Sequence, residues 1–137
     1  MIYEVIDSIL GYYPEAEVSG VEQAYVLMAK LCGAKSDCLG EPYLTHSLNV
    51  AKILTGMHLD VATVTAALLH ESMEYQLLDR EELETVFGSE VANLVAGVTR
   101  ISSLEYTEKT ASHKENLIKM ILSLATDLRI LLIKLAD

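Results

Sequence analysis

Proline, cysteine and basic residues are all scarce in this chain of 137 residues. Two prolines and seven glycines are too few to interrupt helices often, so long helices are expected. The two cysteines, Cys32 and Cys38, are too few for a disulfide framework or for a zinc site made of cysteines alone. We therefore expect free thiols and a cytoplasmic location.

Positive charge is the second shortage. Ten Lys and Arg residues stand against twenty Asp and Glu residues, which gives a formal net charge of -10. Nucleic-acid binding draws its affinity largely from Lys and Arg on phosphates, so we expect no nucleic-acid partner. A phosphorylated ligand would have to be held by a metal ion or by a few local cations.

The sequence also lacks the patterns of a signal peptide and of a membrane-spanning segment. The first residues lack the basic region, apolar stretch and small-residue cleavage site of a signal peptide. No uncharged apolar run reaches membrane-spanning length, so no membrane partner is expected. The sequence stops within an apolar run at residues 128–136, whereas domain termini are usually polar. We therefore expect residues 1–137 to be a single domain, the N-terminal fragment of a longer multidomain protein.

Helical periodicity dominates what is present, and the expected fold class is all-α, a compact helical bundle. The segment 61–73, which Asp60 can cap, is apolar almost all round and is expected to be the central helix. Asp79 should cap a short helix, and the polar stretch 102–114 is predicted to be a loop. The expected helices are 2–10 (ended by Gly11 and Pro14), 21–32, one opened by Pro42, 61–73, 80–87, 90–98, 115–125 and 127–137.

Histidines and acids on three of these helices form a candidate metal set. His46, His70, Glu71 and Asp137 offer imidazole nitrogens and carboxylate oxygens, the donors that a divalent transition metal binds. Such a metal makes a bound water nucleophilic near neutral pH, and a nearby carboxylate can orient that water or move its proton. Glu74 lies four residues after His70 and so shares its helix face, as a candidate for that role.

Each of these residues also has a plainer explanation. Either histidine alone is more often a partly buried side chain with a satisfied hydrogen bond, and the two glutamates alone resemble solvated charges at a helix end. Asp137 alone is merely the last residue, and His58 and His113 lie in polar surroundings that indicate the surface. Residue types by themselves leave the metal site open.

Longer motifs around these residues resemble the RelA/SpoT family, whose members make and degrade the alarmone (p)ppGpp. The similarity runs in order from about residue 13 to the end. It rests on residues 40–46 (GEPYLTH), 66–74 (AALLHESME), 87–92 (FGSEVA), 97–100 (GVTR) and 127–137 (DLRILLIKLAD). The resemblance implies the N-terminal HD domain, an all-α fold that removes the 3′-diphosphate of (p)ppGpp using Mn²⁺. It also implies a synthetase domain further along the full-length protein.

Position by position, the resemblance carries roles to five residues. His46, His70 and Asp137 match the family's metal ligands, and Glu74 matches the first acid of its catalytic Glu-Asp pair. Glu71 stands where the family has the Asp of its His-Asp pair.

Further departures concern proton transfer and nucleotide binding. Tyr75 replaces the second catalytic acid, and a phenol with a pKa near 10 cannot act as a base at neutral pH. Asp37 stands in a loop that is basic in the family, which reverses a favourable charge next to a polyphosphate. Glu71 is one methylene longer than Asp, and errors of about 1 Å can cost a hundredfold in rate.

Three hypotheses follow. The leading one is a degraded HD domain with a structural or regulatory role towards the synthetase. The second is a weakened but working Mn²⁺-dependent (p)ppGpp hydrolase, which would bind a guanosine polyphosphate. The third is a phosphohydrolase for another nucleotide or phosphorylated small molecule, because a fold does not fix a substrate.

Overall fold

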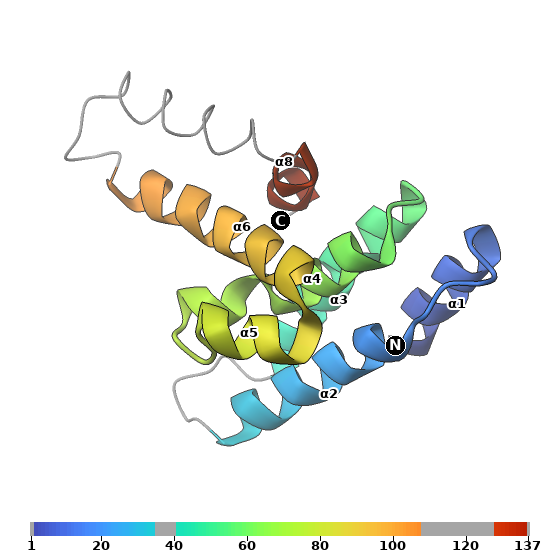
Figure 1. The fold of residues 1–137 in the computed structure, drawn as a ribbon, viewed down its shortest axis with the longest axis horizontal. Coiled ribbons are helices and arrows are strands. Elements are labelled where there is room, and N and C mark those ends of the chain that lie inside the picture. Colours follow the sequence, from blue (N-terminus) through green and yellow to red (C-terminus); the bar gives the residue numbers. More distant parts are fainter. Residues whose placement is uncertain (1, 35–40, 108–127, 137) are drawn as a thin grey trace.

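The computed structural model describes residues 2–34, 41–107 and 128–136, and in these ranges it contains helices and no strand (Figure 1). The all-α prediction is confirmed. The helices are α1 (Ile2–Tyr12), α2 (Ser19–Ala34), α3 (Glu41–Gly56), α4 (Val61–Glu74), α5 (Arg80–Phe87), α6 (Ser89–Thr107) and α8 (Leu128–Ala136). None of the helices in this part of the chain is long and apolar enough to cross a membrane.

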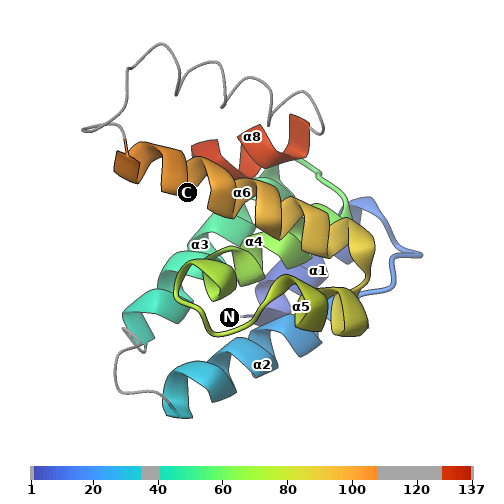
Figure 2. The same ribbon diagram turned by 60° about the vertical axis from the view of Figure 1, so that its left-hand side comes forward.

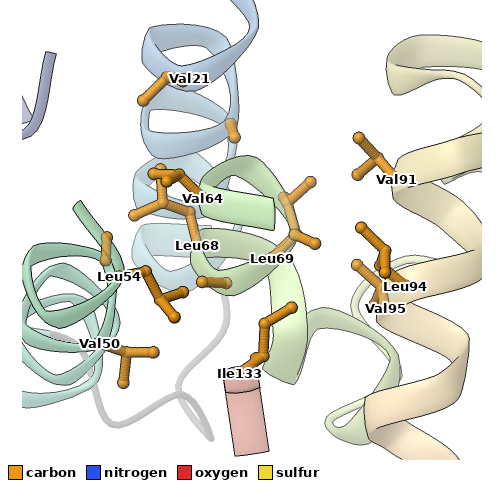
Figure 3. Packing of buried hydrophobic residues seen from close by; sticks show 14 of the residues in the cluster. Val21, Val50, Leu54, Val64, Leu68, Leu69, Val91, Leu94, Val95 and Ile133 are labelled. Atoms are coloured by element: carbon orange, nitrogen blue, oxygen red, sulfur yellow. The ribbon is translucent and has the colours of Figure 1, made fainter. Parts of the chain in front are cut away.

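Helix α4 is the centre of the bundle, as its nearly continuous apolar sequence predicts. It packs against α2, α3, α6 and α8. Figure 3 shows Leu68 and Leu69 of α4 pointing in different directions, toward Leu54 of α3 on one side and the α6 side chains on the other. Every residue from Thr63 to His70 is buried, so the middle of α4 is held on all sides before its polar C-terminal end begins.

Several predicted boundaries need correction. Helix α1 runs through Gly11 to Tyr12, so only the region of Pro14 ends it. Helix α6 extends to Thr107, well past residue 98, because the buried Ile101 continues its apolar face beyond Val98. The first part of the predicted loop 102–114 is therefore helical, whereas the predicted helix 115–125 lies outside the described residues.

The short helix α5 matches its prediction residue for residue. The Asp79 side chain accepts a hydrogen bond from the Glu82 backbone N–H at 2.8 Å, which is the expected cap. Asp60 stands at the N-cap position of α4 but makes no such bond to the backbone. Its carboxylate instead accepts from the Thr63 hydroxyl and from Arg129, so the predicted position is right and the predicted bond is wrong.

Helix α8 packs mainly against α6, beside which it lies in Figure 2, and it also contacts α3 and α4. Arg129 donates to Asp60 and to Glu90 at 2.7 Å each, which joins the first turns of three helices. A Cβ on Gly97 would clash with the end of the Ile130 side chain, so the glycine lets α6 and α8 approach each other here without a shift of Ile130. The segment that leads to Asp137 is thus positioned on the same bundle as His46 and His70.

Candidate metal centre

Two neighbouring helices supply the histidines of the candidate site. His46 lies in the second turn of α3 and is half-buried. His70 lies near the C-terminal end of α4 and is only 1% exposed. Because α3 and α4 pack side by side, their rings come together, with ring centres 5.9 Å apart and planes inclined at 62°. The fold therefore joins two residues that are 24 positions apart in the sequence.

Glu71 completes a cluster of three donor residues. Its Oε1 lies 3.4 Å from Nε2 of His70 and 3.7 Å from Nε2 of His46. One donor atom from each of the three side chains lies within 4.8 Å of the others. The longer glutamate side chain therefore still brings an oxygen within 4 Å of both imidazoles.

The ring of His70 is oriented by the backbone of its own helix. Its Nδ1 lies 2.5 Å from the carbonyl oxygen of Ala67, which can only accept a hydrogen bond. Nδ1 therefore carries a proton, and in the neutral form of the ring the lone pair is on Nε2, toward Glu71. Metal-bound histidines are held by the same kind of bond from the second ring nitrogen to a carbonyl or carboxylate.

These positions fit a divalent ion. Donor atoms that share one ion lie about 3–4 Å apart, because each is roughly 2.0–2.2 Å from the metal. The two distances from Glu71 fall in this interval. Moreover, a carboxylate oxygen that faces an imidazole lone pair needs a cation or a further proton in the contact. Two imidazoles with one carboxylate are a donor set for Zn²⁺, Mn²⁺ or Fe²⁺ rather than for Ca²⁺.

Among the described residues, the predicted catalytic acid Glu74 is not one of these three donors. Glu74 is exposed in the last turn of α4, and Tyr75, the residue that follows it, is 48% exposed. Asp137 follows the last residue of α8, and its position lies outside the described residues, as does that of Asp37. The structure thus brings together His46, His70 and Glu71 and leaves the role of the other residues to proposal.

Helix α4 ends immediately after these residues in a Schellman motif. The N–H of Leu77 donates to the carbonyl of Ser72, and the N–H of Gln76 donates to that of Met73. Gln76 has a φ of 58°, in the left-handed region that favours glycine. This ending sets where the chain leaves the helix just beyond Glu74.

Sequence reasoning missed the partner of His70. The Ala67 carbonyl could not be found from residue types, because every residue offers the same group. Ser47 and Ser72, which follow His46 and Glu71 directly, were also missed. Their hydroxyl oxygens are buried without a hydrogen-bond partner among the described atoms. The sequence carried no signal for this, since serine is common at helix surfaces.

A comparison with known protein families identifies the family of the domain that carries this cluster. A family model described as "HD domain" matches residues 24–137, which contain all three cluster residues. The chain belongs to the HD domain family. HD domains are helical and metal-dependent, in agreement with the bundle and with the group formed by His46, His70 and Glu71.

Individual relatives show which type of HD domain the chain resembles. The chain is 40% identical over 135 residues to "GTP pyrophosphokinase rsh" of Brucella ovis, covering 98% of this chain and 18% of that protein. It is 45% identical over 132 residues to "GTP pyrophosphokinase" of Myxococcus xanthus, covering 92% of this chain and 17% of that protein. The bifunctional (p)ppGpp synthase/hydrolase SpoT of Escherichia coli K12 is 37% identical over 137 residues, covering 99% of this chain and 20% of SpoT.

These matches confirm the resemblance drawn from the motifs. The HD domain described above is of the RelA/SpoT type, with a His-Glu pair at residues 70 and 71. It spans about a fifth of the length of the curated relatives that it matches.

Proposed function

We propose that this chain is the N-terminal HD domain of a RelA/SpoT-type protein of (p)ppGpp metabolism, and that it retains a metal site but has lost most of its hydrolytic activity. In the full-length protein it would act as a structural or regulatory partner of a synthetase domain in the cytoplasm. Support comes from relatives about five times as long, among them a GTP pyrophosphokinase and a (p)ppGpp synthase/hydrolase.

A retained metal site is supported by the geometry of the cluster. His46, His70 and Glu71 would hold the ion, and Asp137, the residue after α8, is proposed as a fourth ligand. Mn²⁺ is the proposed metal because the family resemblance implies it, and two imidazoles with carboxylates can hold it. When bound, such an ion activates water and shields phosphate charge. The single observation that carries the proposal is the approach of Glu71 Oε1 to both imidazoles, at 3.4 and 3.7 Å.

Loss of turnover is supported by the residues beside the cluster. Glu74 is exposed at the end of α4, where a carboxylate can take up and release protons, so it is the proposed catalytic acid or base. Tyr75, however, offers a phenol where the family pattern has the second carboxylate of the pair. A phenol is protonated at neutral pH and cannot accept a further proton there. Asp37 adds a negative charge in the loop that the family uses to hold the nucleotide.

A weakened but active Mn²⁺-dependent (p)ppGpp hydrolase is the second candidate. Glu71 favours it, because its carboxylate reaches the cluster despite the additional methylene. Glu74 would then transfer the proton without a second carboxylate beside it. An HD phosphohydrolase acting on another nucleotide is the third candidate. The choice of (p)ppGpp over another nucleotide rests on the relatives.

Pyrophosphate release from ppGpp by the full-length protein in saturating Mn²⁺ separates these candidates. The leading proposal predicts release no faster than that of a His70→Ala variant, together with bound Mn²⁺ in the unaltered protein. Release that His70→Ala abolishes would establish the second candidate. Release from another nucleotide but not from ppGpp would establish the third.

A further inference from the structure

Helices α2 and α5 border an apolar groove whose lining includes none of the residues of the histidine cluster. Both ribbon views place the two helices side by side (Figures 1 and 2). One hollow of about 480 Å³ is lined by Val26 and Leu27 of α2 together with Val86 of α5. A second hollow of about 440 Å³ shares Leu27 and Val86 and continues along α5 to Phe87 and Leu78. The two hollows therefore adjoin each other at Leu27 and Val86, and we call them together the groove.

Apolar side chains from both helices form what we call the floor of this groove. Val26 is 43% exposed and Val86 is 47% exposed, and they come from different helices. Single exposed apolar side chains are common and need no explanation, but those that line one hollow from two elements offer a shared apolar surface to a partner. Helix α5 buries only Leu83 of its eight residues and packs on α6, so its other face is available.

The rim of the groove is strongly acidic. Four carboxylates, those of Glu22, Asp79, Glu81 and Glu82, line the two hollows, against one cation, Lys30. The chain as a whole has a net charge of -10, which adds a long-range field of the same sign. A partner that fits this surface must therefore carry Lys or Arg around an apolar stripe.

The form of the partner follows from the elements that border the groove. The described part of the chain has no strand, and so no sheet edge to which an extended peptide could add. A hollow between two helices accepts the apolar face of a third helix, with anchors at positions i, i+3 or i+4, and i+7. A second copy of this chain is disfavoured, because it would bring another surface with a net charge of -10.

We propose that the groove between α2 and α5 is the docking site of a basic amphipathic helix of a partner protein. Apolar side chains of the partner enter the two hollows, and its Lys or Arg side chains pair with the acidic rim. This interaction requires neither the metal nor hydrolysis, so it can be tested independently of the proposed function.

Fluorescence anisotropy with a labelled helical peptide tests the proposal. The probe is a peptide of about 18 residues, five turns of helix, with leucines on one face and lysines on the others. The chain should bind it with micromolar affinity, and should not bind the same peptide with glutamate in place of lysine. Val26→Lys and Val86→Lys should each weaken binding by about tenfold or more. Ile53→Lys is the matched control: it makes the same charge change at a residue of α3 that is 50% exposed, and should alter binding by less than about twofold.

A milder variant covers the case in which a lysine in the groove disturbs folding. Glu81→Gln with Glu82→Gln leaves the floor intact and should weaken binding by about threefold, with a smaller dependence on salt. Equal losses in Ile53→Lys and Val86→Lys would overturn the proposal, because binding would then follow net charge alone. No binding of the lysine peptide would also overturn it. So would sedimentation as a dimer that Val86→Lys dissociates, since a second copy would then occupy the groove.

Discussion

Helices α3 and α4 end with the same backbone arrangement, but different residues surround the two ends. Each has a non-glycine residue at a φ of 58°, His58 after α3 and Gln76 after α4. Each has the paired bonds of a Schellman motif, with Leu59 donating to the carbonyl of Leu54 and Leu77 donating to that of Ser72. The backbone alone therefore does not distinguish the helix end that carries the candidate metal site from the one that does not.

The side chains around the two ends make the distinction. Tyr12 of α1 stacks on His58 at 4.7 Å between ring centres and donates from its hydroxyl to the Leu59 carbonyl at 2.6 Å. The end of α3 is thus held by another helix. The end of α4 instead carries the buried His70 and the half-buried Glu71, followed by exposed polar residues. Polar groups beside a buried donor cluster can meet a substrate, whereas Tyr12 holds the end of α3 through its contacts with His58 and Leu59.

The largest expected effect is a difference between His70 and His58 in the stabilisation that Mn²⁺ gives. With Mn²⁺ at a hundredfold excess over its dissociation constant, the metal should raise the free energy of unfolding by about 2–3 kcal/mol. His70→Ala should abolish this gain, because it removes one of the cluster's imidazoles. His58→Gly is the matched control, and it should retain the full gain. Unfolding in denaturant with and without Mn²⁺ measures both, and an equal loss in the two variants would contradict the comparison.

Tyr75→Asp tests whether the end of α4 lacks a proton acceptor. In the full-length protein it should raise pyrophosphate release from ppGpp on the order of tenfold. This is less than the hundredfold or more that a general acid or base usually contributes, because Glu71 and Asp37 remain. Tyr75→Asn has nearly the same shape but cannot act as a base, so its rate should stay that of the unaltered protein. Equal rates for the two variants would show that the tyrosine is not the defect.

Tyr12→Phe tests the structural end of α3. Loss of the hydrogen bond to Leu59 should lower the free energy of unfolding by about 1 kcal/mol and leave Mn²⁺ affinity unchanged. Tyr13→Phe is the control, since Tyr13 is 53% exposed and should change stability by less than about 0.5 kcal/mol.

The same residue predicts a pH dependence. Burial, with a smaller contribution from the charge of Asp60, raises the pKa of Tyr12 above its usual value. Its stabilisation is therefore complete below about pH 10, where an unfolded tyrosine ionises, and falls as the pH rises through the higher folded pKa. Chemical unfolding between pH 8 and pH 11 should show a steeper alkaline loss in the unaltered chain than in Tyr12→Phe. Parallel curves would contradict this account.

The smallest expected effect compares the two left-handed residues themselves. Gln76→Gly should stabilise the chain by about 0.5–1 kcal/mol, because the left-handed conformation costs a non-glycine residue about 1–2 kcal/mol and glycine's flexibility offsets part of the gain. His58→Gly should gain less, since it also loses the stacking on Tyr12. Thermal unfolding of the two variants measures the two gains in stability. A larger gain at position 58 would mean that Tyr12 does not hold the end of α3.

The sequence predicted the parts of this domain that depend on local pattern. The cap at Asp79, the limits of α5 and the central place of α4 follow from capping chemistry and from apolar residues on every face. The proximity of His46 to His70 came from the family resemblance, because spacing along the chain does not reveal which helices pack together.

Other features depended on contacts between distant residues. The Ala67 carbonyl orients His70, and Arg129 joins Asp60 to Glu90, yet neither contact has a signature in residue types. The sequence did not indicate the left-handed conformation of Gln76 either, because glycine is the residue that usually adopts it at the end of a helix. Backbone acceptors and packing between helices therefore account for most of what the sequence did not reveal.

Pulsed electron paramagnetic resonance of the Mn²⁺-loaded chain tests the central claim, that His46 and His70 join Glu71 around one metal ion. With ¹⁵N-labelled histidine, the account predicts ¹⁵N couplings from two directly bound imidazoles, reduced to one in His46→Ala. A spectrum with only oxygen and water ligands, or one that His46→Ala leaves unchanged, would contradict it.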